Sequence, residues 1–377
     1  MSRRNFSKRG RSPVAARDED SCDVRYYRRI GQFVLLACIT AGLLWAAAGD
    51  GGCSDIEIRV ENFTVPPATG PLANIRVHNH GDSTCDVSIQ PKFPDGWQWT
   101  PGRRTMSIGP GEVKRAAFAI EKASDVESNR YPIEVIVLNG SEKKVHRQEV
   151  VCASAPYFKP KIDGKFKDWA DAIGVTFTAG DKKTIVSTYW NKKQFCLYVQ
   201  VEEDKLLRHK KGAGKVDAVQ FALARRDAVT GSEPSAKADR YEFVLIDSAG
   251  MFARAKCFCL ITPGEALSKT VLPRPLESLE LKEAKVVVKR KGNITHYECA
   301  IPFSVMPQIK PDVGREICFS ILVHDPDGTG VRDWGEAAGL GPNQRNRFAW
   351  CAWGKVDWSS RPACDGKVEW GLCSSKH

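Results

Sequence analysis

The run Glu202-Glu203-Asp204 is the group of residues in this chain whose type and spacing come nearest to catalytic chemistry. Glycoside hydrolysis uses two carboxyl groups about 5 to 10 Å apart, one as acid and one as base or nucleophile. Adjacent residues of a strand point to opposite faces, so Glu202 and Glu203 cannot converge on one bond. We therefore interpret the run as the exposed acidic end of a strand.

Other catalytic and metal-binding spacings are missing or incomplete. The sequence contains no Gly-x-Ser-x-Gly, no His-Glu-x-x-His and no phosphate-binding loop. Asp325-Pro326-Asp327-Gly328 offers two carboxylates to a cation but lacks the remaining ligands of an EF-hand, so we expect a plain turn. Cys257 and Cys259 share a strand face without a second Cys or His pair at ligand spacing. We predict a protein that is not an enzyme and needs no metal or cofactor.

Residues 156–354 consist of strand-like runs separated by turn residues. Strands must therefore position any site in this part of the chain. Each run alternates or is continuously apolar, and no run predicts a helix longer than a few turns. Two antiparallel sheets packed face to face would bury one side of every strand and leave the other for loops or ligand. The runs are 185–190, 195–201, 217–223, 241–245, 285–288, 295–301 and 316–323.

Residues 54–152 predict a smaller sandwich. About seven short runs in roughly 100 residues, with turns at Gly, Pro and Asn, are typical of an immunoglobulin-like domain. The order of runs and turns, with Pro94-Asp95-Gly96-Trp97 and Pro110-Gly111-Glu112, resembles the small Ig-like domain found beside bacterial glycosidases. That resemblance implies a spacer without catalytic residues. Trp97 and Trp99 are either a sugar platform or a plug at one end of the sandwich.

The N-terminal end is typical of a membrane anchor or an export signal. Residues 1–29 carry nine Lys and Arg against four acidic residues, and so hold nearly half of the net charge of +11. They precede the apolar run 30–48, which as a helix would rise about 28 Å, close to the hydrocarbon thickness. This is either a cleaved secretion signal or a transmembrane anchor with its basic end in the cytoplasm. Both place the rest of the chain outside the cytoplasm, and neither indicates nucleic-acid binding.

Thirteen cysteines agree with export. Two pairs are plausible disulfides, Cys85 with Cys152 and Cys364 with Cys373. The second pair lies in a tail, residues 355–377, that we assign to neither sandwich.

A set of short motifs in residues 160–353 resembles the family 9 carbohydrate-binding modules and their DOMON-like relatives. The motifs occur in the order found in that family, and the similarity covers about half the chain. The resemblance implies a larger sandwich of jelly-roll or DOMON-like type and non-catalytic sugar binding, often beside a polysaccharide-degrading enzyme. The motifs are 162–169, 189–199, 217–221, 241–243, 296–302, 317–325, 332–335 and 346–350.

The same resemblance implies a site and shows where this chain departs from it. In the family two aromatic side chains sandwich a sugar ring while charged groups bind its hydroxyls. The loops that should supply those aromatics, 211–215 and 341–344, contain none. Trp190 and Trp334 lie near turns and are the candidate replacements. The candidate ligand contacts are Gln220, Glu242, Arg332, Trp334, Asn343 and Arg345.

We therefore expect an all-β protein of two antiparallel sandwiches, displayed outside the cytoplasm on a membrane anchor through residues 30–48 or secreted. Its expected partner is a glycan or polysaccharide, and a glycoside hydrolase is a second candidate partner. Alternatives are an envelope scaffold that binds proteins after losing the sugar clamp, or an accessory subunit of a hydrolase system. A haem-binding relative would need ligands from Met251, Met306 and His324.

Overall fold

The computed structural model describes residues 55–210, 215–225, 240–250, 253–265, 276–334 and 368–372. Strands dominate these residues, and every sheet pairing between named strands is antiparallel, so the expected all-β class is confirmed. The helices among them are short 3-10 turns, and none is long and apolar enough to cross a membrane. These turns are η1 (Pro67–Thr69), η2 (Phe166–Trp169), η3 (Leu276–Leu279) and η4 (Phe303–Val305). The segments 1–29 and 30–48 lie outside the described residues.

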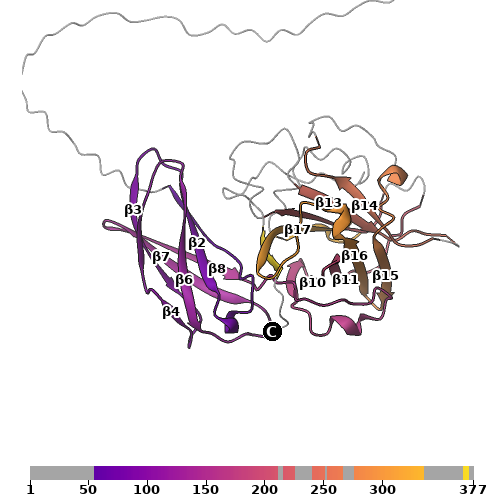
Figure 1. The fold of residues 1–377 in the computed structure, drawn as a ribbon, viewed down its shortest axis with the longest axis horizontal. Helices are drawn as coiled ribbons and strands as arrows, with labels where there is room; N and C mark the ends of the chain where they lie inside the picture. The colour runs from indigo at the N-terminus through magenta and orange to yellow at the C-terminus, as the bar shows by residue number, and fades with distance from the viewer. Residues whose placement is uncertain are drawn as a thin grey trace, which may run out of the picture. The chain divides into compact units, whose positions relative to one another are not determined.

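Two four-stranded sheets build the N-terminal sandwich (Figure 1). In spatial order the first contains β1 (Ile56–Val60), β2 (Leu72–Asn79), β6 (Val113–Lys122) and β4 (Gln98–Thr100). The second contains β5 (Arg104–Ile108), β3 (Cys85–Lys92), β7 (Tyr131–Asn139) and β8 (Glu142–Val150).

Alternation of apolar and polar residues explains this sandwich. In β2 every second side chain, from Ala73 to Asn79, is buried, and those between are partly exposed. Trp97 is buried in the core, where its ring stacks on Phe93 with centroids 5.9 Å apart. Trp99 packs edge-on against the same Phe93 ring at 5.1 Å. Both tryptophans therefore fill the sandwich, and the plug is the interpretation that fits.

The predicted disulfide between Cys85 and Cys152 is wrong. Cys85 is disulfide-bonded, whereas Cys152 is a buried thiol, so the two do not bond to each other. Sequence spacing could not reveal this, because both residues flank strands that several pairings would satisfy. The other predicted pair, Cys364 with Cys373, lies outside the described residues.

Two larger sheets form the second sandwich (Figure 1). The five-stranded sheet contains, in order, β15 (Lys285–Lys291), β16 (Ile294–Pro302), β11 (Gln194–Glu202), β10 (Lys182–Trp190) and β9 (Val175–Ala179). The six-stranded sheet contains β14 (Lys256–Ile261), β13 (Arg240–Ile246), β12 (Ala218–Arg225), β17 (Arg315–Asp325) and β18 (Gly330–Trp334), with β19 (Val368–Leu372) also paired to β17.

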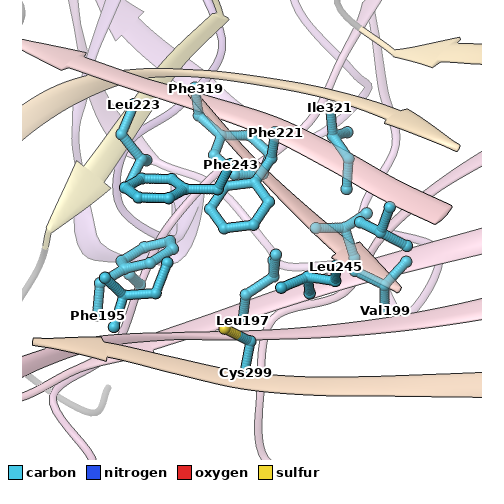
Figure 2. Packing of buried hydrophobic residues seen from close by; sticks show 14 of the residues in the cluster. Phe195, Leu197, Val199, Phe221, Leu223, Phe243, Leu245, Cys299, Phe319 and Ile321 are labelled. Atoms are coloured by element: carbon cyan, nitrogen blue, oxygen red, sulfur yellow. The ribbon is translucent and has the colours of Figure 1, made fainter. Parts of the chain in front are cut away.

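Aromatic and branched side chains from both sheets interleave to make the core of this sandwich. Figure 2 shows the rings of Phe221, Phe243 and Phe319 from the six-stranded sheet facing Phe195 and Leu197 from β11. The Phe221 and Phe243 centroids are 5.3 Å apart, within the range of favourable ring contacts. Core residues occupy odd positions on β12 and β13, so even positions on these strands face the other way.

The outward-facing side chains of the six-stranded sheet are also buried. All of β13 and all of β12 except Arg225 are shielded from solvent, unlike the alternating strands of the first sandwich. A strand buried on both faces reads as a continuous apolar run, which is why β12 and β13 lack polar alternation. The polar residues that interrupt these runs therefore need a separate explanation.

Candidate functional site

Three side chains form a hydrogen-bonded row across the outer face of the six-stranded sheet. Gln220 on β12 donates from its amide to a carboxylate oxygen of Glu242 on β13. The Gln220 carbonyl oxygen lies 2.8 Å from Nε2 of His324 on β17. All three residues are at most 1% exposed. The row thus places a carboxylate, an amide and an imidazole on three neighbouring strands.

Strand register explains why the row runs diagonally. Gln220 lies directly opposite Val244 and Leu322, whereas Glu242 and His324 lie opposite Ala222 and Ala218. Because the two alanines extend little from the sheet, the long Gln220 side chain can reach across to both polar neighbours. Substituting either alanine with a larger residue would compete for that space.

Two more polar groups lie beside the row. Nε of Arg240 is 3.4 Å from Oε2 of Glu242, and both side chains are almost completely buried. Ser320 faces the same side, directly opposite Ala222, and its hydroxyl has no hydrogen-bond partner among the described residues. A guanidinium, a carboxylate, an amide, an imidazole and a hydroxyl therefore gather on one sheet face. Such a set can bind a ligand with many hydroxyl groups.

Apolar residues surround these polar groups on the same face. They form two clusters, one toward β14 and one toward β18. Phe258 on β14 belongs to the first, so an aromatic ring is present on this face. Their members are Val216, Ala218, Val244, Ile246, Phe258, Leu260 and Ile261, and Ala222 and Leu322 with Val331.

The structure does not bring Arg332 and Trp334 to this face. Their neighbour Val331 packs on the outer face, so alternation on β18 turns both of them toward the other sheet. Trp334 packs against the core, with Phe177 and Phe319 centroids 6.5 and 6.4 Å away. The prediction that these two residues share a site with Gln220 and Glu242 is therefore wrong. The resemblance did not indicate which side chains of β18 face outward. Asn343 and Arg345 lie outside the described residues.

Arg332 instead holds together the end of the sandwich. It is 1% exposed, and its guanidinium donates to Asp325 at 2.8 Å and to the carbonyl oxygen of Glu202 at 2.6 Å. It also donates to Thr184 and Thr329. These bonds tie β18 to β10, β11 and the turn after β17.

Three carboxylates, those of Glu203, Asp217 and Asp325, meet beside this arginine. One oxygen from each lies within 4.8 Å of the others. Oε2 of Glu203 and Oδ1 of Asp217 are buried and have no hydrogen-bond partner among the described residues. The predicted acidic strand end is thus half right, since Glu202 is partly exposed and Glu203 is buried.

Burial and mutual repulsion change the titration of these acids. The pKa of Glu203 is raised to about 7 and that of Asp217 to about 8, chiefly by burial and in part by the neighbouring carboxylates. Hydrogen bonds from Thr329 and Arg332 outweigh burial at Asp325 and lower its pKa. The three oxygens have the chemistry of a Ca²⁺ site. Arg332 and Arg290 already supply positive charge to the group, and partial protonation of Glu203 and Asp217 reduces its negative charge.

Met306 and His324 cannot serve together as the ligands of the haem alternative. Met306 is buried in the core between the two sheets, whereas His324 projects from the opposite face of the six-stranded sheet. Two axial ligands of one haem cannot lie on opposite sides of a sheet. Met251 lies outside the described residues.

Sequence reasoning found two members of the polar row and missed the others. Gln220 and Glu242 came from the family resemblance, and the structure places them in contact. Arg240 precedes Glu242 by two positions and so shares its face, which was a readable signal. His324 and Ser320 could not be assigned, because they belong to the site only through the pairing of β17 with β12.

No family model and no curated protein match this chain. Solved structures similar to it include two of a family 9 carbohydrate-binding module from Caldicellulosiruptor kristjanssonii. The complex with glucose is 14% identical, over 48% of this chain and 81% of that one, with a TM-score of 0.31. The complex with cellotriose is 15% identical, over 55% and 96%, with a TM-score of 0.33.

A FixG-related protein from Vibrio parahaemolyticus is also similar, at 16% identity over 26% of this chain and 94% of that chain, with a TM-score of 0.20. These values do not establish a residue correspondence with any of the three structures. The site is therefore argued from the residues of this chain alone.

Proposed function

We propose that this chain is a non-catalytic carbohydrate-binding protein, and that it binds its ligand on the outer face of the six-stranded sheet. The observation that carries this proposal is the row of Glu242, Gln220 and His324 on the face of the six-stranded sheet that points away from the core between the two sheets. Buried polar groups cost stability compared with apolar residues of similar size. Their presence on three adjacent strands therefore favours a role in recognition.

The composition of this face suits a sugar. Hydroxyl groups need directional donors and acceptors, which the carboxylate, amide, imidazole and guanidinium provide. The C–H face of a sugar ring needs an apolar partner, and Phe258 with its aliphatic neighbours provides one. Because the row is shielded from solvent, a ligand reaches it only when this face opens. Binding should therefore change hydrogen exchange in β12 and β13.

We further propose that the protein acts outside the cytoplasm. The disulfide at Cys85 supports this, because structural disulfides persist in oxidising compartments. The basic residues 1–29 followed by the apolar run 30–48 support either an anchor or an export signal. A glycoside hydrolase partner is a further part of this proposal, since binding without catalysis is useful beside an enzyme that cuts the same polymer.

A glycan array with the full chain tests the proposal. Cellotriose, named in one of the similar structures, is included with a panel of plant and bacterial polysaccharides. We expect binding that Glu242→Gln weakens by about 10- to 100-fold, the loss expected from a hydrogen bond to a charged group. Glu298→Gln is the matched control, because Glu298 is equally buried but lies on the five-stranded sheet.

Two outcomes would contradict sugar binding at this face. One is the absence of a glycan signal from a protein with a normal circular dichroism spectrum. The other is equal binding by the Glu242→Gln and Glu298→Gln variants. Absence of glycan binding together with stoichiometric binding of an envelope protein would support the scaffold alternative.

A further inference from the structure

Two histidines and a glutamate meet on the N-terminal sandwich, away from the proposed sugar-binding face. His78 is the penultimate residue of β2 and His80 follows the end of that strand. Residues two positions apart on an extended chain project to the same side. The backbone N–H of His80 donates to the carbonyl oxygen of Asp55 at 2.9 Å, which keeps the chain extended beside β1. Glu57 on β1 lies directly opposite His78 in the strand register.

The side chains of these residues are close enough to share one ion. Oε2 of Glu57 lies 3.0 Å from Nε2 of His80, and the ring centroids of His78 and His80 are 3.7 Å apart. One ligand atom from each residue lies within 4.8 Å of the other two. Two ligands of a tetrahedral ion with bonds of about 2.0 to 2.1 Å are separated by about 3.3 Å. Small side-chain rotations would therefore complete the geometry.

An ion pair between Glu57 and His80 does not account for the whole arrangement. Nδ1 of His78 is enclosed and has no hydrogen-bond partner among the described residues. A buried ring nitrogen without a partner is costly. A cation bound by the imidazoles removes this cost, because it can use the enclosed ring nitrogen of His78 as a ligand.

We propose that Glu57, His78 and His80 bind one divalent transition-metal ion, of which Zn²⁺ is the representative. Two imidazoles and a carboxylate suit Zn²⁺, Cu²⁺ or Ni²⁺, whereas Ca²⁺ and Mg²⁺ prefer oxygen ligands alone. Glu57 and His80 are about one third exposed, so solvent can reach the site and water can fill the fourth position. The bound ion ties the start of β1 to the end of β2. It therefore stabilises the N-terminal sandwich by mass action.

Metal titration of the full chain, purified without a histidine tag and treated with a chelator, tests this proposal. We expect one equivalent of Zn²⁺ by calorimetry and the visible absorption of a tetrahedral ion with Co²⁺. His80→Gln and His78→Gln should each weaken binding by more than about tenfold, since loss of even a supporting partner costs about 10- to 100-fold. Zn²⁺ should raise the melting temperature of the unmodified protein but not of these variants.

His146→Gln is the matched control, because His146 lies on β8 of the same sandwich, where its Nε2 is 3.2 Å from Oε1 of Gln148, and it does not belong to the group of Glu57, His78 and His80. It should bind Zn²⁺ like the unmodified protein. Equal affinity of the His80→Gln and His146→Gln variants would overturn the proposal, and so would the absence of stoichiometric binding. Binding that survives His78→Gln and His80→Gln but is lost in Asp217→Asn would place the ion at the carboxylate cluster instead.

Discussion

Glu298 holds Trp169 flat against the five-stranded sheet. One carboxylate oxygen accepts a hydrogen bond from the indole Nε1 at 2.9 Å, and the other accepts one from the backbone N–H of Gly164 at 2.7 Å. The indole ring stacks on Tyr189 and Tyr198, with centroids 5.1 Å away in each case. The segment that precedes β9 therefore covers the outer face of this sheet. Its Asp-Gly-x-x-x-Asp-Trp motif is a structural clasp rather than a ligand site.

Replacing Trp169 should separate the packing of this clasp from its hydrogen bond. Trp169→Ala removes a buried indole and should lower the free energy of unfolding by about 3 to 5 kcal/mol. Trp169→Phe keeps most of the ring but leaves Oε1 of Glu298 without its donor, which should cost about 1 to 3 kcal/mol. Urea unfolding followed by circular dichroism measures both. If the two variants were equally stable, the indole ring would not be packed as described.

The all-β class could be predicted because the residues of each short run are enough to indicate a strand. Runs such as 295–301 and 316–323 are strands in the structure, as β16 and β17. Loop chemistry and strand length decide these features within a few residues. The plug role of Trp97 was one of two interpretations, and only packing on Phe93 distinguishes them.

The candidate site could be predicted only in part, because it depends on pairing between distant strands. Gln220 and His324 are 104 positions apart and meet only through the register of β12 with β17. The prediction that Arg332 and Trp334 belong to this site was wrong for a related reason, since a sequence does not show which face of β18 points inward. The acidic run was misjudged at Glu203, whose burial depends on Thr295 and Arg290 from another hairpin.

Arg332 should be required for folding rather than for ligand contact. Its removal would leave Asp325 as an uncompensated buried charge, so Arg332→Met should lower the free energy of unfolding by about 3 to 5 kcal/mol. Arg147→Met is the matched control: Arg147 and Glu134 form an ion pair at 2.7 Å, but Arg147 is exposed. That change should cost less than about 1 kcal/mol. Equal losses in chemical denaturation would show that burial does not decide the value of the Arg332 pair.

Gly164 should resist substitution for two reasons that a control can separate. Its φ of +72° strains any L side chain, and an added Cβ would lie 2.6 Å from atoms of the Lys289 side chain. Gly180 also has a positive φ, of +60°, but a Cβ there meets nothing within 4 Å. Gly180→Ala should therefore cost only the backbone strain, about 1 to 2 kcal/mol.

Gly164→Ala should cost more than Gly180→Ala, because it also displaces Lys289, whose amino group donates to the carbonyl oxygen of Gly164 at 3.3 Å. Urea midpoints of the two variants give the comparison. A Gly164→Ala protein as stable as the Gly180→Ala protein would mean that Lys289 moves aside without loss.

Asp217 should make the fold less stable as the pH rises toward 8. Burial raises its pKa to about 8, so the folded protein keeps a proton that the unfolded chain loses near its ordinary value of 3.8. Stability from this group is complete below about pH 4 and is lost as the pH rises to about 8. Glu203, with a pKa of about 7, acts in the same direction. His296 acts oppositely, since burial lowers its pKa to about 4 and protonation at low pH destabilises the fold.

Asp217→Asn isolates the contribution of Asp217 to the pH dependence of stability, because Glu203 and His296 remain in both proteins. The amide cannot ionise, and its oxygen can still accept the hydrogen bond that the backbone N–H of Leu207 donates to Asp217 at 2.5 Å. Relative to the unmodified protein, the variant should gain stability steadily between about pH 5 and pH 8, at about 1.4 kcal/mol for each pKa unit crossed. Urea unfolding across this range, with a chelator present, measures the difference. A difference that stays constant with pH would mean that Asp217 is already ionised in the folded protein throughout this range.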